Sequence, residues 1–62
     1  MILNIFPHVG YTLSISSAYS RLISLYKGQG QAYPKNKAAG SLGGSVSKGV
    51  IALNNGFYTR IK

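Results

Sequence analysis

The chain contains no aspartate and no glutamate, while five lysines and two arginines give it a formal charge of +7. Acidic residues make up about an eighth of an average composition, so drawing none in a chain of this length has odds on the order of one in a few thousand. No acidic side chain offsets the positive charge. We therefore expect the balancing negative charge to come from outside, as nucleic acid phosphate, anionic lipid head groups or an acidic protein surface.

The length of the chain limits its core. A chain of 62 residues forms at most one small domain, or one extended subunit, and a domain of that size buries only about 60% of its unfolded surface. Cysteine is absent and His8 is the only histidine, so neither a disulfide nor a structural metal is available. The sequence thus predicts little independent core, no metal and no cofactor. We expect support from a larger protein or ribonucleoprotein assembly.

Residues 1–10 open with an apolar cluster that ends at Pro7 and Gly10. We interpret this segment as an apolar arm that docks on a protein neighbour. A short strand, or a cap on a local core, is the alternative. The predicted docking residues of the arm are Ile2, Leu3, Ile5 and Phe6.

Residues 11–27 have the periodicity of an amphipathic helix, which we place at about 14–27. Thr12 or Ser14 provides an N-cap, and Gly28 provides a stop. The front of this segment also alternates in the manner of a strand, from Tyr11 to Ser16. The apolar face supplies three further predicted docking residues, Ile15, Leu22 and Ile23.

Residues 28–48 hold five of the eight glycines and show neither helical nor strand periodicity. We expect this basic glycine- and serine-rich segment to be extended along a partner. In contrast, residues 49–62 carry Asn55-Gly56 between β-branched and aromatic residues, the pattern of a β-hairpin with a type I′ turn. The predicted fold class is small α+β, with one helix, an extended middle and a C-terminal hairpin.

Catalysis is not expected, because general acid-base chemistry draws on carboxylates, histidine or cysteine and only His8 is present. His8 has no carboxylate to orient it. The glycine-rich segment contains neither of the common phosphate-loop patterns. We predict no catalytic residue.

Basic residues interleaved with aromatic ones are the combination used for phosphate contact and base stacking. Tyr33 and Tyr58, each close to a lysine or arginine, are the preferred stacking residues, whereas Tyr19 and Tyr26 belong to the apolar helix face. The predicted polyanion-binding residues are Arg21, Lys27, Tyr33, Lys35, Lys37, Lys48, Tyr58, Arg60 and Lys62.

These features favour a small basic, non-enzymatic structural or accessory subunit of a macromolecular complex. The preferred partner is nucleic acid, and the preferred nucleic acid is the ribosomal RNA of an organellar or divergent ribosome. The protein would then be an RNA-binding ribosomal protein, part of a ribonucleoprotein. One alternative is association with an anionic membrane surface, as a peripheral small subunit of a membrane protein complex or as a cationic membrane-active peptide. Another alternative is an internal virion protein.

The compartment is left open, with the mitochondrion or another organelle suspected. Residues 1–26 are acid-free, serine-rich and amphipathic, like organellar targeting segments, although an ordinary helix has the same composition. A transmembrane helix needs about 20 predominantly apolar residues, and no stretch of the sequence reaches that length. We expect neither a cleaved presequence nor a transmembrane helix.

Overall fold

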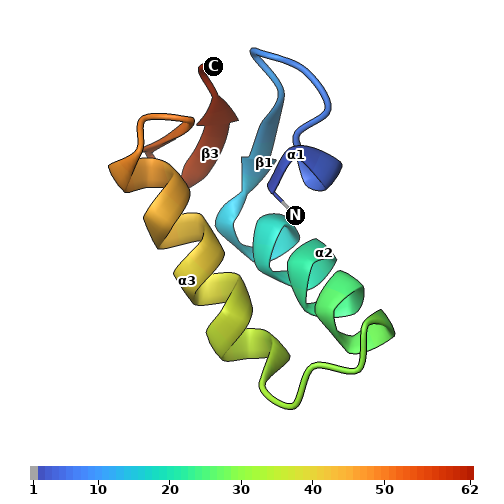
Figure 1. Cartoon of the computed structure of the whole chain (residues 1–62). Helices are drawn as coiled ribbons and strands as arrows, with labels where there is room; N and C mark the ends of the chain where they lie inside the picture. The colour runs from blue at the N-terminus through green and yellow to red at the C-terminus, as the bar shows by residue number, and fades with distance from the viewer. Residues whose placement is uncertain (1) are drawn as a thin grey trace.

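The computed structural model describes residues 2–62 and contains three helices and three strands within that range. Figure 1 shows α2 and α3 as a helical hairpin, with the strands at the end away from the connection between the two helices. The predicted small α+β fold class is confirmed. The elements, in chain order, are α1 (Ile2–Ile5), β1 (Thr12–Ser14), α2 (Ile15–Gly28), α3 (Pro34–Ser47), β2 (Ile51–Asn54) and β3 (Phe57–Arg60).

The three strands form an antiparallel sheet in the order β1-β3-β2. The turn between β2 and β3 is Asn55-Gly56, and both residues have positive φ, +51° and +81°. This is the backbone that a type I′ turn requires, and asparagine and glycine are the residues that tolerate it best. The hairpin expected in residues 49–62 is therefore confirmed.

The third strand, β1, joins the hairpin through a bulge. The Gly10 N–H donates to the Arg60 carbonyl at 2.8 Å, and the Arg60 N–H donates to the Tyr11 carbonyl at 2.9 Å. Gly10 and Tyr11 thus oppose a single residue, and Gly10 has φ +90°, as in a bulge that begins with a left-handed glycine. The strand-like front of residues 11–16 is a short strand that passes directly into a helix.

Helix α2 confirms the predicted helix at 14–27. The Ser14 hydroxyl oxygen caps it by accepting from the Ser17 N–H at 3.2 Å. At its other end Gly30, not Gly28, adopts the left-handed conformation. The Gly30 and Gln31 N–H groups then donate to the Lys27 and Tyr26 carbonyls, the hydrogen bonds of a Schellman motif.

Helix α3 corrects the expectation that residues 28–48 are extended. Pro34 occupies the first turn, and Ala38 and Leu42, one turn apart, are buried. The Tyr26 and Ser41 hydroxyls hydrogen-bond across the two helices. No helical periodicity is visible in the sequence because only Ala38 and Leu42 of α3 are buried. Packing against α2 compensates for the low helix propensity of the glycines in α3.

The core corrects the expectation of little independent core. The radius of gyration, 10.8 Å, is close to the about 10.6 Å expected of a compact domain of this length. The arm is part of this core: Ile2, Ile5 and Phe6 are buried in one cluster with residues of α2, α3 and the sheet, and α1 contacts both α2 and α3. The buried set is completed by Leu13, Ala18, Leu22, Tyr26, Ala38, Leu42, Ile51 and Tyr58.

Candidate polyanion-binding surface

The fold gathers four of the predicted polyanion-binding residues where α2 passes into α3. We call this group the hairpin tip; it consists of Lys27, Tyr33, Lys35 and Lys37. Lys27 lies in the last turn of α2, and the other three residues begin α3. All four are exposed. The sequence did not identify the tip as a unit, because the tip exists only once residues 34–47 form a helix.

Tyr33 is the aromatic residue of the tip, and 72% of its surface is accessible. It is the N-cap of α3 and provides no side-chain acceptor for the first turn. Lys35 and Lys37 follow two and four positions later, so their side chains leave the helix on different sides. The positive end of the α3 dipole lies among these lysines and adds to their potential.

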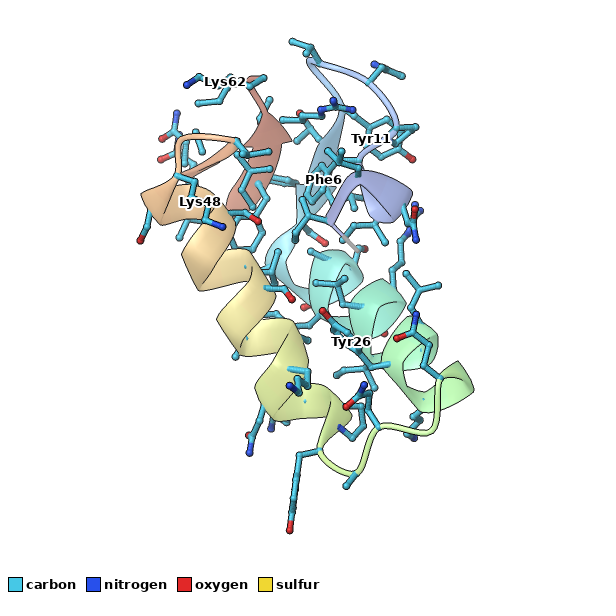
Figure 2. The ribbon with its side chains drawn as sticks, viewed as in Figure 1. Phe6, Tyr11, Tyr26, Lys48 and Lys62 are labelled. Carbon is cyan, nitrogen blue, oxygen red and sulfur yellow. The ribbon has the colours of Figure 1, made fainter. Side chains whose placement is uncertain are left out.

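A second group of cations, Lys48, Arg60 and Lys62, lies near the opposite end of α3. Figure 2 shows Lys48 and Lys62 at the end of the molecule that carries the C-terminus. The Arg60 guanidinium is already engaged, because Nη1 donates to the Phe6 carbonyl at 2.9 Å and Nε donates to the Lys62 carbonyl at 3.1 Å. Arg60 therefore ties Phe6, the residue that follows α1, to β3, and it is half-buried.

Arg21 belongs to neither group. It lies on the exposed side of α2, where its Nη1 donates to the Tyr11 hydroxyl at 3.3 Å. The Tyr11 ring makes edge-to-face contacts with Phe6 and with His8, at ring-centre distances of 6.3 and 5.3 Å. Arg21 thus packs beside an aromatic cluster at the N-terminal side of the molecule.

The position of Tyr58 corrects the prediction that its ring stacks on a base. It is 7% exposed and lies on the helix-facing side of the central strand, between Leu13 of β1 and Leu53 of β2 in register. Burial, together with the nearby Tyr19 phenol, raises the pKa of Tyr58 above its usual value of 10.0. In this fold its ring is a core residue and is not accessible to a base.

Some of the predicted docking residues are likewise buried and others are exposed. Ile2, Ile5, Phe6 and Leu22 are buried inside the chain's own core, and Ile23 is half-buried against it. These side chains are therefore not available to a neighbour in this fold. Leu3 and Ile15 are exposed.

Two of the shallow hollows on the surface of residues 2–62 lie against α1, and neither gathers reactive groups. One, of about 410 Å³, lies between α1 and α3 and has Lys48 as its single charged residue. The other, of about 470 Å³, lies between α1 and α2 beside Arg21. Within residues 2–62 no three potential metal ligands come together, and no helix there is long and apolar enough to cross a membrane.

Comparison of the chain with protein-family models, with curated proteins and with solved structures returned no match.

Proposed function

We propose that the protein is a non-enzymatic accessory subunit that binds a polyanion, with RNA as the preferred partner. The observation that supports this proposal is the unbalanced charge: seven basic side chains, no acidic one, and three of the seven lysines and arginines beside an exposed tyrosine at the hairpin tip. Lysines contact phosphate without reading sequence, and an exposed ring stacks on an unpaired base.

The tip is the preferred contact surface because its cations are not engaged by the chain itself in the way that Arg60 is. It also combines them with Tyr33, whereas the ring of Tyr58, two residues before Arg60, is buried. A single-stranded or looped RNA would place phosphates on Lys27, Lys35 and Lys37 and a base on Tyr33.

The membrane alternative receives less support from the fold. An interfacial helix needs a free apolar face, and the apolar face of α2, formed by Ala18, Leu22 and Tyr26, is buried against the rest of the chain.

The proposal is tested by two variants, each of which removes two positive charges from one end of the molecule. Lys35→Gln/Lys37→Gln removes two charges from the tip, and Lys48→Gln/Lys62→Gln removes two from the other end. Lys35 and Lys48 are about 20 Å apart along α3, more than two Debye lengths of about 8 Å at physiological salt. Each end therefore contributes separately to binding.

We expect the tip variant to weaken binding to single-stranded RNA and to reduce the slope of log affinity against log salt by about 1.4, since each lost contact contributes about 0.7. The far-end variant should retain most of the slope. Tyr33→Ala should weaken binding by about 1 kcal/mol or more without lowering the melting temperature, and Tyr33→Phe should leave it unchanged. Equal effects of the two double variants, or a slope near zero for the original chain, would remove the proposal.

A further inference from the structure

The two edges of the sheet differ in how they are protected against pairing with another strand. The edge formed by β1 is three residues long, begins after the Gly10 bulge and passes into α2 at the next residue. The edge formed by β2 is four residues long, Ile51–Asn54, and contains no charge, no proline and no bulge. Lysines, prolines and bulges are the usual devices that block an edge, so β2 is the unprotected one.

The hydrogen bonds of the hairpin define which backbone groups β2 presents outward. Its two-residue turn closes on the pair Asn54↔Phe57, and the Ile61 N–H donates to the Val50 carbonyl at 2.9 Å. Hydrogen-bonded pairs alternate with non-bonded ones along an antiparallel ladder. The N–H and C=O of Ala52 and Asn54 therefore face β3, whereas those of Ile51 and Leu53 face outward from the sheet.

The side chains of β2 also leave its outer edge open to an added strand. Leu53 shares its face of the sheet with the buried Leu13 and Tyr58, yet 49% of it is exposed because it lies at the open edge. Ala52, on the other face, is small and half-buried. An apolar side chain next to outward backbone donors and acceptors is what an added strand would cover.

We propose that the β2 edge pairs antiparallel with the β2 edge of a second copy of this chain, giving a continuous six-stranded sheet. The two-fold axis passes between Ala52 and Ala52 of the second copy, which form a non-hydrogen-bonded pair. Ile51 then lies opposite Leu53 of the second copy, and the two equivalent pairs make four backbone hydrogen bonds. The exposed Leu53 gains an apolar neighbour on the face that carries the core.

The distribution of charge favours this arrangement over a parallel one. Lys48 lies three residues before Ile51, so an antiparallel pairing places it near the uncharged turn Asn54–Gly56 of the second copy. A parallel pairing would place it beside its own equivalent. Because each copy still carries +7, added salt should strengthen the pairing by screening the repulsion, the opposite of its effect on RNA binding.

The register is tested by single cysteines, since the chain has none of its own. In the proposed pairing the Cα atoms of the two Ala52 residues are about 4.5 Å apart, within the range that a disulfide spans. The two Asn54 residues, on the same face of the same strand, are about 14 Å apart. Ala52→Cys should therefore form a cross-linked dimer under mild oxidation at least about tenfold faster than Asn54→Cys. Equal rates would contradict the register.

A second pair of variants tests the surface itself by sedimentation at chain concentrations up to about 1 mM, because a small interface is weak. Leu53 and Phe57 are both 49% exposed, but Phe57 is on the central strand, away from the edge. Leu53→Lys and Phe57→Lys add the same charge. We expect Leu53→Lys to abolish the dimer and Phe57→Lys to retain it, with the fold of both checked by circular dichroism. A chain that is monomeric at every concentration and salt overturns the proposal.

Discussion

At the scale of single residues, burial changes what a side chain can do. Tyr33 and Tyr58 are the same residue type and each lies close to basic residues in the sequence, yet one is 72% and the other 7% exposed. Their positions in the sequence do not separate them, because neither the α2–α3 connection nor the face of β3 is defined until the sheet and helices pack. Tyr33 therefore stays a predicted stacking residue, whereas burial makes the ring of Tyr58 inaccessible to a base in this fold.

The raised pKa of Tyr58 predicts a loss of stability in alkali. Its phenol is buried, so the folded chain holds the proton to a higher pH than the unfolded chain, whose tyrosine titrates near 10.0. The stability from this residue is fully present below that pH and is lost as pH rises through the folded pKa. Tyr58→Phe should therefore reduce the alkaline loss of melting temperature, measured by thermal unfolding at neutral pH and above pH 10.0.

Tyr33→Phe is the matched control for this measurement, because Tyr33 is exposed. It should leave the alkaline loss of melting temperature as it is in the original chain. If Tyr58→Phe and Tyr33→Phe lost melting temperature equally in alkali, the buried position of Tyr58 would be wrong.

At the scale of elements, α3 is the helix that the sequence did not predict. Gly40, Gly43 and Gly44 lie within it, none has positive φ, and a methyl group added at any of them would meet no atom within 4 Å. Each glycine lowers helix stability by about 0.8–1.0 kcal/mol relative to alanine, with no steric need for it inside this chain. Composition therefore pointed away from the helix that tertiary packing stabilises.

Replacing these glycines should stabilise the protein. We expect Gly40→Ala, Gly43→Ala and Gly44→Ala each to add about 0.5–1 kcal/mol to the free energy of unfolding, and the triple variant to raise the melting temperature by about 10 °C. Gly30→Ala, at a position with φ +76° and equally open space, should instead destabilise by about 1 kcal/mol. A triple variant no more stable than the original chain would mean that residues 34–47 are not helical in solution.

The elements that the sequence did predict have local signals. Helix α2 has a capping serine and an apolar residue at each turn, and the hairpin has Asn55-Gly56, whose preference for positive φ is a property of the dipeptide. Strand β1 has only the short alternation of residues 11–16, which overlaps the helical pattern, and helix α1 has no local signal. They are defined by pairing with β3 and by burial of Phe6, contacts between residues far apart in the sequence.

At the scale of the whole molecule, the charge of +7 is confined to a body whose dimensions are 30 × 19 × 19 Å. The Debye length at 0.01 M salt is about 30 Å, so at low salt every cation repels every other, whereas at 0.15 M it is about 8 Å. We therefore expect the melting temperature to rise between these salt concentrations, and to rise further with a polyanion at constant salt. A melting temperature that falls with salt would contradict this account.

The order of the strands has a consequence for synthesis. The strand that joins the other two, β3, is made after both of them, and β1 has no strand to pair with until residues 57–60 are available. On a translating ribosome α2 and α3 are therefore both synthesised while β1 and β2 are still unpaired. Formation of the native sheet consequently waits until β3 emerges from the exit tunnel.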